Sequence, residues 1–331
     1  MEKVKIGLFG TGHMGKIHLQ LLRQIPSFII MGFYDPDAET SRMVSEKFGI
    51  RSFSTPEALI DICDAVDIVA PTRAHYALAL AALKKGCHIF AEKPLAANVQ
   101  EARELVKMVE EAGVVGMVGH VERYNPAYQA VQHIPLNPLF IEVHRLAHFN
   151  PRGADVSVVL DLMIHDLDII LSLVKGNVRN VSASGVAILT DSADIANVRI
   201  EFDNGCVANL TASRISLKVM RKMRLFQGGA YISLDFQEKK AEVVRISREP
   251  VDAPSVNPME IDTQQGKRYV TFEMPEVRES NAIQMELEAF SESILLRKKP
   301  PVSFRDGLQA MELADTIQEK INKQLQIQSS L

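Results

Sequence analysis

The sequence of 331 residues predicts an α/β protein in two parts: a doubly wound parallel sheet, then an α+β domain with a large open, mostly antiparallel sheet. Up to about residue 120, short β-branched runs alternate with amphipathic stretches, which is typical of parallel strands joined by helices. From residue 123, strand-like runs follow one another with turn signals such as Asp203-Asn204-Gly205 between them. We therefore expect domains over residues 1–122 and 123–331.

The first domain is expected to contain six strands and five helices, which make a complete doubly wound sheet. The strands are predicted at residues 4–9, 28–34, 51–53, 65–70, 88–91 and 114–118. The helices are predicted at residues 14–24, 38–48, 56–61, 74–85 and 99–112.

The second domain is expected to consist of a broad sheet with three helices. Strands are predicted at residues 139–145, 181–189, 196–202, 206–213, 223–227, 230–235 and 240–246. Helical patterns are predicted at residues 156–173, 281–297 and 305–322. The last of these helices follows a turn at Lys299-Pro300-Pro301.

The composition is that of a globular protein, with 47% hydrophobic and 24% charged residues and no repetitive tract. A formal net charge of −4 argues against nonspecific nucleic-acid binding. The spacing of Cys63, Cys87 and Cys206 fits neither a metal site nor a disulfide framework. No stretch reaches 18 uninterrupted apolar residues, so we expect a soluble protein with no membrane partner. The isolated cysteines indicate a reducing cytoplasm, and the net charge predicts no nucleic-acid partner.

A glycine-rich motif, Gly10-Thr11-Gly12-His13-Met14-Gly15, follows the first predicted strand and opens the first helix. Glycines there permit a tight turn, and the helix amides can receive a pyrophosphate. Asp35 lies 20 residues beyond Gly15, at the end of the second strand, where a carboxylate accepts hydrogen bonds from the ribose hydroxyls and repels a 2′-phosphate. A structural turn is the alternative, but the motif and the acid together predict a Rossmann domain that binds NAD in preference to NADP.

The fourth predicted strand is followed by Pro71, Thr72 and His75. They lie at the carboxyl edge of the predicted sheet, where open α/β folds bind their ligands. We expect them to approach the ribose and nicotinamide of the cofactor. The alternative is an ordinary turn with Thr72 as the helix cap, and both interpretations can hold together.

The fifth predicted strand ends in Glu92-Lys93-Pro94, at the same edge, and the proline forces the chain to turn. Most lysines are surface residues. At this edge, however, the ammonium of Lys93 is suited to polarise a substrate oxygen and to stabilise a developing alkoxide. We expect Glu92 and Lys93 to border the cofactor, and Lys93 to be catalytic.

The helical pattern at residues 156–173 carries Asp161 and His165 four residues apart, hence on one helix face. Removing hydride from a carbinol carbon requires a base for the hydroxyl proton, and a neutral imidazole is suited to that role. Asp161 would orient the imidazole or share the proton. The alternative is the polar face of an amphipathic helix, and we interpret Asp166 and Asp168 as solvated or structural residues.

The motif at residues 10–15, the element Glu92-Lys93-Pro94 and the pair Asp161 and His165 resemble, in order and spacing, those of an oxidoreductase family. This is the family of glucose-fructose oxidoreductase, inositol dehydrogenase and the rhizopine-catabolism protein, Gfo/Idh/MocA. The resemblance covers essentially the whole chain, and the lysine-proline element is its specific part. It implies that Lys93, Asp161 and His165 line the reacting centre and that the protein is a homodimer or homotetramer.

Arg123, Tyr124 and Asn125 follow the last strand of the first domain, where the family commonly has an Arg-x-Asn-Pro element. The longer form in this chain is similar to members that act on nucleotide-linked sugars, notably on UDP-N-acetylglucosamine at its 3-position. The similarity implies that these three residues bind the substrate. The alternative is a helix start, with Asn125 as the cap.

A basic segment, residues 214–224, holds five cations and no acidic residue. Its arginines Arg214, Arg221 and Arg224 are suited to a sugar diphosphate, because arginine offers bidentate donors to phosphate oxygens. A solvated strand edge and a subunit contact are the alternatives.

These observations predict an NAD-dependent dehydrogenase that needs no metal and oxidises a secondary hydroxyl of a sugar, most specifically of a nucleotide-linked amino sugar, to a ketone. One alternative is the same chemistry on a free sugar or cyclitol. The other is a regulator that senses the dinucleotide without catalysis, since a fold does not determine a function. The complete set of Lys93, Asp161 and His165 favours the enzyme.

Overall fold

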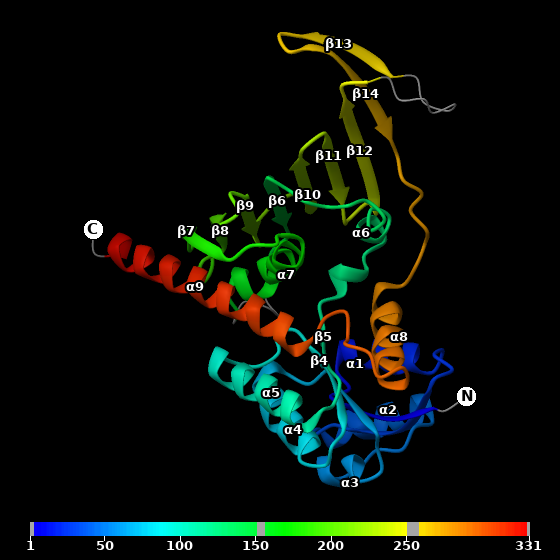
Figure 1. Cartoon of the computed structure of the whole chain (residues 1–331). Coiled ribbons are helices and arrows are strands. Elements are labelled where there is room, and N and C mark those ends of the chain that lie inside the picture. Colours follow the sequence, from blue (N-terminus) through cyan, green and yellow to red (C-terminus); the bar gives the residue numbers. More distant parts are fainter. Residues whose placement is uncertain (1–2, 151–155, 250–257, 330–331) are drawn as a thin grey trace. The chain divides into compact units, whose positions relative to one another are not determined.

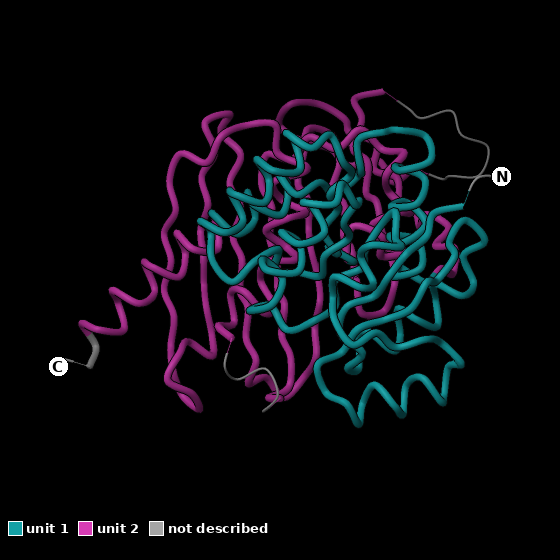
Figure 2. The backbone as a smooth tube through the Cα atoms, turned by 90° about the horizontal axis from the view of Figure 1, so that it is seen from below, with its two compact units in different colours: residues 1–121, 281–312 teal, residues 122–280, 313–331 magenta. Residues whose placement is uncertain are grey.

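The structure is a computed structural model that describes residues 3–150, 156–249 and 258–329 (Figure 1). The chain divides into two compact units, which are described separately (Figure 2). Unit 1 comprises Met1–Val121 and Asn281–Glu312, and unit 2 comprises Glu122–Ser280 and Leu313–Leu331. Throughout the described ranges, every helix is too short or too polar to span a bilayer.

Unit 1 is built on a parallel five-stranded sheet in the order β2-β1-β3-β4-β5. Its strands are β1 (Val4–Phe9), β2 (Phe28–Tyr34), β3 (Ala65–Ile68), β4 (His88–Glu92) and β5 (Gly116–Gly119). The predicted parallel sheet is confirmed, and its strand order reverses direction beside β1, the point at which such sheets bind ligands. The predicted strand at residues 51–53 is reduced to one bridge between Ser52 and Phe33, because the chain enters the next helix at Pro56.

Five helices connect these strands: α1 (His13–Leu22), α2 (Ala38–Phe48), α3 (Pro56–Ile60), α4 (His75–Leu83) and α5 (Val99–Ala112). The helices α2 and α5 have the predicted bounds, because both ends carry strong signals. Asp37 and Asn98 accept hydrogen bonds from the first turns of α2 and α5, and Gly49 and Gly113 follow their last turns in the left-handed conformation.

Residues 281–312 join unit 1, which differs from the predicted division at 122/123 into two continuous segments. Side-chain packing explains why residues 281–312 belong to unit 1. The helix α8 (Ala282–Leu295) buries Leu287 and Phe290 completely. The ring centroid of Phe290 lies 5.8 Å from that of Phe90 on β4 and 6.4 Å from that of Phe28 on β2. The helix therefore forms part of the core of unit 1.

Unit 2 is built on a nine-stranded sheet in the order β13-β14-β12-β11-β10-β6-β9-β8-β7. Its pairs are antiparallel except for β6 with β9, so the predicted open, mostly antiparallel sheet is confirmed. The strands are β6 (Phe140–Leu146), β7 (Val178–Val186), β8 (Ile195–Phe202), β9 (Val207–Ser213), β10 (Met220–Gln227), β11 (Ala230–Asp235), β12 (Lys240–Ser247), β13 (Met259–Thr263) and β14 (Gly266–Glu273). The last two were not predicted, and β13 is exposed along its whole length.

One face of this sheet buries the core of unit 2 against helices. The predicted helical pattern at residues 156–173 is a π-helical turn over Val159–Met163 that continues into α7 (Ile164–Leu173). Short helical turns cover Val121–Tyr124 and α6 (Pro126–Gln129), and α9 (Phe304–Ser329) is the last helix in the described residues. Figure 1 shows α7 and the later part of α9 on one side of the strands.

Candidate functional site

The glycine loop joins β1 to α1 through close backbone contacts. Gly10 has a φ of +88°, and a Cβ added there would lie 2.6 Å from Cα of Ala70. A Cβ added to Gly15 would lie 2.0 Å from the carbonyl oxygen of Gly10. Gly12, in contrast, has no neighbour within 4 Å of an added Cβ. The loop thus requires glycine at positions 10 and 15 for its own conformation, and Gly12 leaves open space at the amino end of α1.

Asp35 is held at the end of β2 by the glycine loop. The backbone N–H and the hydroxyl of Thr11 donate to its Oδ2 at 2.7 and 2.9 Å, and the N–H of Asp37 donates to its Oδ1 at 3.0 Å. Thr11 is buried, and the neighbouring His13 and Met14 are exposed at the start of α1. The carboxylate and the loop therefore form one arrangement, as the predicted dinucleotide motif requires.

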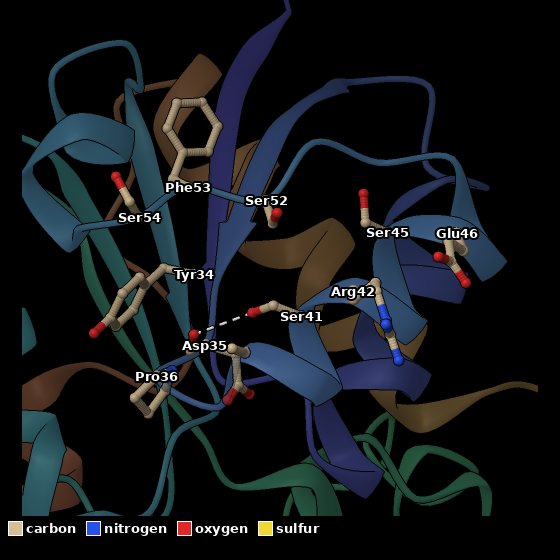
Figure 3. Close-up of a pocket in the computed structure, with 11 residues that line it drawn as sticks. Tyr34, Asp35, Pro36, Ser41, Arg42, Ser45, Glu46, Ser52, Phe53 and Ser54 are labelled. Carbon is tan, nitrogen blue, oxygen red and sulfur yellow. Dashed lines mark hydrogen bonds between the residues drawn. The ribbon is translucent and has the colours of Figure 1, made fainter.

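A pocket of about 670 Å³ opens beside Asp35 (Figure 3). Its walls come from the end of β2, from α2 and from residues 52–54. Ser41 donates to the carbonyl oxygen of Asp35 at 3.1 Å, and Arg42 and Glu46 also line the pocket. The volume falls within the roughly 300–1,000 Å³ of small-molecule sites. Its position at the carboxyl end of β2 suits the adenosine end of a dinucleotide.

The turn after β3 is fastened to the turn after β4 by a buried imidazole. His75 begins α4, with Nε2 2.8 Å from the carbonyl oxygen of Ala70 and Nδ1 3.0 Å from that of Pro94. Thr72 starts a single 3-10 turn, and its side chain does not cap α4. Pro71 is exposed beside it. His75 thus supports the edge of the sheet on which Lys93 stands.

Lys93 follows β4 directly and is half-buried, and the peptide bond to Pro94 is cis. Its backbone N–H donates to Oε2 of Glu92 at 3.3 Å. Nε2 of His18 lies 3.2 Å from Oε1 of Glu92, and Nδ1 of His18 lies 2.9 Å from Oδ2 of Asp67. A second buried imidazole, from α1, therefore contacts Glu92, the residue that precedes the lysine-proline turn.

Electrostatics links these groups. Burial lowers the pKa of His18, but Asp67 and Glu92 have the larger combined effect, and the net pKa lies well above its ordinary value. Burial raises the pKa of Glu92, but His18 and Lys93 outweigh it, and the pKa of that carboxyl is lowered. Glu92 is therefore an anion, and the positive charges of His18 and Lys93 both favour its ionised form.

Sequence reasoning missed His18 and Asp67. One signal was present: Asp67 is an acidic residue inside the four-residue strand β3, whose residues are all buried. A carboxylate at such a position needs a buried partner. Nothing in the spacing indicates that this partner lies 49 positions earlier on α1.

In unit 2, Asp161 and His165 lie on the same helical segment, and both are half-buried, whereas Met163 and Ile164 between them are buried. Asp161 belongs to the π-helical turn, and its N–H donates to the carbonyl oxygen of Ser157 at 2.9 Å. Such turns inside α-helices frequently occur at functional sites. The structure thus places the two predicted residues four positions apart on one helical segment, and their joint role stays a prediction.

Asp166 is buried and is structural, not solvated. Arg145 of β6 donates from Nε and Nη2 to its two carboxylate oxygens at 2.7 and 2.8 Å. The same guanidinium donates from Nη1 to Glu122 at 2.8 Å. The side chains of Arg145 and Asp166 are 4% and 2% exposed, so the pair is shielded from water. It ties the helix that carries His165 to the sheet.

The predicted substrate residues Arg123, Tyr124 and Asn125 also make structural contacts. Nε and Nη2 of Arg123 donate to the carboxylate of Asp168 at 2.5 and 2.9 Å, and Asp168 is buried. Asn125 caps α6 and donates to Glu122 at 2.9 Å, and Tyr124 is buried. These contacts agree with a helix start. A substrate role for the three residues stays a prediction.

The three arginines of the basic segment lie in three different surroundings. Arg214 is buried, with Nε donating to Asp194 at 2.9 Å and Nη2 to Thr190. Arg221 and Arg224 lie on opposite faces of β10, because side chains alternate along a strand. Arg224 pairs with Glu142 of β6 at 2.8 Å. Diphosphate binding by these residues stays a prediction, and the structure does not assemble all three into one patch.

Two family models match the chain. One, described as an oxidoreductase family with an NAD-binding Rossmann fold, matches residues 4–120. The other, described as the GFO/IDH/MocA C-terminal domain, matches residues 99–225.

Individual relatives extend the match. The UDP-N-acetylglucosamine 3-dehydrogenase of Acidithiobacillus ferrooxidans is 39% identical over 237 residues, which cover 71% of this chain and 75% of that protein. The scyllo-inositol 2-dehydrogenase (NAD(+)) of Bacillus subtilis is 30% identical over 65% of this chain and 68% of that protein. A solved structure of the Acidithiobacillus enzyme superimposes with a TM-score of 0.86 at 32% identity, covering 97% of this chain and 98% of that one.

Proposed function

The chain belongs to the Gfo/Idh/MocA family of NAD-binding oxidoreductases, dehydrogenases that act on CH–OH groups of sugars and cyclitols, and from this premise we propose that its substrate is a nucleotide-linked amino sugar. The proposed reaction oxidises the 3-hydroxyl of UDP-N-acetylglucosamine, or of a close analogue, to a ketone. One observation carries this choice: the UDP-N-acetylglucosamine enzyme is 39% identical, against 30% and 24% for two inositol dehydrogenases.

The cofactor is proposed to bind at the carboxyl edge of the sheet of unit 1. The amides at the start of α1 would hold its pyrophosphate, with Gly12 leaving the space. Asp35 would accept hydrogen bonds from the ribose hydroxyls, and the turns after β3 and β4 would approach the nicotinamide. NAD supplies the hydride acceptor when it is bound.

We propose that three residues carry out the removal of the proton from the substrate hydroxyl. Lys93 would hold the substrate oxygen and stabilise negative charge as the hydroxyl proton leaves. His165 would accept that proton, and Asp161 would orient the imidazole. Support for these roles comes from the positions of the three residues in the family pattern and from the half-buried surroundings of each side chain.

Substrate labelling tests the proposed position of oxidation. With UDP-N-acetylglucosamine deuterated at C3, we expect deuterium to appear in the reduced cofactor and kcat to fall when hydride transfer limits turnover. Deuterium at C4 serves as the control and should stay in the sugar. Transfer from C4, or turnover with no transfer from C3, would refute oxidation at the 3-position.

The glycine loop gives a matched pair of variants. Gly15→Ala is expected to destabilise unit 1 and abolish NAD binding, because its methyl group would meet the Gly10 carbonyl. Gly12→Ala is expected to leave the free energy of unfolding within about 0.5 kcal/mol of wild type, yet to weaken NAD binding, because the methyl group occupies the proposed pyrophosphate space. Thermal unfolding and NAD titration measure both effects. Equal NAD affinity in wild type and Gly12→Ala would contradict the proposed binding position.

Asp35→Ser is expected to raise the KM for NAD about tenfold and to lower the KM for NADP. The substitution removes the hydrogen-bond acceptor for the ribose and the repulsion of a 2′-phosphate. Thr11→Ala is the control, because it removes one contact to Asp35 and keeps the carboxylate. An unchanged ratio of NAD to NADP efficiency in Asp35→Ser would argue against the ribose contact.

A further inference from the structure

One imidazole and three carboxyl groups, from four different elements, meet in the interior of unit 1. His18 comes from α1, Asp67 from β3, Glu92 from β4 and Glu286 from α8. The side chains of His18, Asp67 and Glu286 are fully buried, and that of Glu92 is 17% exposed. We call these residues the buried tetrad. It adjoins Lys93, which follows Glu92 in the chain.

Three members of the tetrad are joined in a chain. Asp67 faces Nδ1 of His18 at 2.9 Å, and Glu92 faces Nε2 at 3.2 Å. A doubly protonated imidazole carries one N–H toward each of these carboxylates; the N–H at Nδ1 is hydrogen-bonded to Asp67, and the contact of Nε2 with Glu92 is an ion pair. Of the other ionisable groups near Glu92, Lys93 contributes a positive charge, and His75 places its ring nitrogens toward two carbonyl oxygens.

Glu286 is the unexplained member. Its carboxyl group is fully buried, and neither oxygen has a hydrogen-bond partner among the described residues. One of its oxygens lies within 4.8 Å of both a carboxylate oxygen of Glu92 and a ring nitrogen of His18. An ionised Glu286 would be a third buried carboxylate, facing Asp67 and Glu92 with His18 as the cation among them. Such a charge is costly unless it is paired.

We propose that Glu286 is a neutral carboxylic acid whose proton is directed at the carboxylate of Glu92, and that this contact positions the turn carrying Lys93. A neutral acid has one donor, and a buried donor needs an acceptor. Glu92 is an anion, and one of its carboxylate oxygens lies within 4.8 Å of an oxygen of Glu286. Glu286 is then a positioning residue that acts on Lys93 through Glu92. This positioning role rests on the proposed function.

The protonation state has a consequence for stability. Burial, and then the negative charge of Glu92, raise the pKa of Glu286 well above its ordinary value. A carboxyl whose pKa is higher in the folded state favours folding below its unfolded pKa, and this contribution is lost as the pH rises toward the folded pKa. Glu286→Gln keeps the donor and cannot ionise. We therefore expect the melting temperature of Glu286→Gln, relative to wild type, to rise between pH 5 and pH 8.

Two substitutions at Glu286 separate positioning from charge. Glu286→Gln is expected to keep kcat within about threefold of wild type, because the amide still donates toward Glu92. Glu286→Leu removes the donor and is expected to lower kcat about tenfold or more at an unchanged KM for NAD. Equal turnover in the two variants would overturn the positioning role. The acidic limb of the pH profile of kcat should also shift in the leucine variant and stay in place in the glutamine variant.

Infrared spectroscopy tests the proton itself, without reference to any substrate. At pH 7 the wild type is expected to show a carbonyl band of a protonated carboxylic acid that shifts in heavy water and is absent from Glu286→Gln. If the band is present and no sugar is turned over, the proposed function fails and the neutral acid stands. A missing band overturns the proposal. So does one equivalent of a divalent metal in the purified wild type that is absent from Glu286→Gln, because a cation would then neutralise the tetrad.

Discussion

Replacing Lys93 with methionine is expected to lower kcat about 10³-fold at saturating NAD and sugar. The methionine side chain keeps much of the length of lysine and removes the ammonium that is proposed to stabilise the developing alkoxide. Loss of one such donor typically costs about 10²- to 10³-fold in turnover. The backbone contacts of the turn should persist, so the KM for NAD should change less than kcat. Stopped-flow measurement of NADH formation resolves the two parameters.

Lys85→Met provides the matched control. Lys85 lies in the same unit, is 57% exposed and pairs with Asp61 at 2.7 Å on the surface. Its loss should leave kcat unchanged. Lys93→Arg should fail to restore the rate, because the planar guanidinium cannot place its charge where the ammonium lies. Turnover of Lys93→Met near the wild-type value would remove Lys93 from the proposed mechanism.

His165→Asn addresses which group accepts the proton. If His165 is the base, the variant should lose about 10²-fold in kcat and also lose the acidic limb of the kcat profile, since a base must be unprotonated to act. The same profile in Lys93→Met should keep that limb. The opposite pattern would assign proton acceptance to Lys93 and leave His165 as an orienting residue.

Asp166→Asn is expected to lower the free energy of unfolding by about 3 kcal/mol. The substitution leaves the guanidinium of Arg145 buried, with only Glu122 to balance its charge. Removing one partner of a buried ion pair typically costs about 3–5 kcal/mol. Because α7 also carries His165, activity should fall along with stability. Urea unfolding at neutral pH measures the difference.

Glu260→Gln is the corresponding surface control. Glu260 pairs with Lys267 at 2.9 Å, and both side chains are more than half exposed. Exposed ion pairs contribute about 0–1 kcal/mol. A loss in Asp166→Asn no larger than that in Glu260→Gln would show that the buried pair contributes little to unit 2.

The sequence predicted elements well where local signals are complete. The helices α2 and α5 begin and end at the predicted residues, because a capping side chain and a left-handed glycine mark their limits. The strand β13 was not predicted; it is only five residues long, and all of its side chains are exposed. The placement of α8 in unit 1 depends on Phe290 meeting Phe28 and Phe90, a contact between distant segments that no local pattern encodes.

In the candidate site, too, the features with local sequence signals could be predicted and those that depend on distant contacts could not. The glycine loop and Asp35 could be predicted together, because their spacing follows from one strand-helix-strand unit. The ion pairs of Arg123, Asp166 and Arg214 could not be predicted, because the charged partner of each residue lies more than ten positions away in the sequence. The basic segment was predicted as one binding site from its density of positive charge along the sequence. Side chains alternate along β10, however, so Arg221 and Arg224 lie on opposite faces of the strand.

The central claim concerns the substrate, and a comparison of kcat/KM for NADH formation tests it most directly. The comparison sets UDP-N-acetylglucosamine against free N-acetylglucosamine and myo-inositol, with the same enzyme and NAD concentrations. We expect the nucleotide sugar to be favoured by at least about 10²-fold, the gain from two charge-assisted hydrogen bonds to its diphosphate. Turnover of a free sugar or myo-inositol without turnover of the UDP-sugar would contradict the claim.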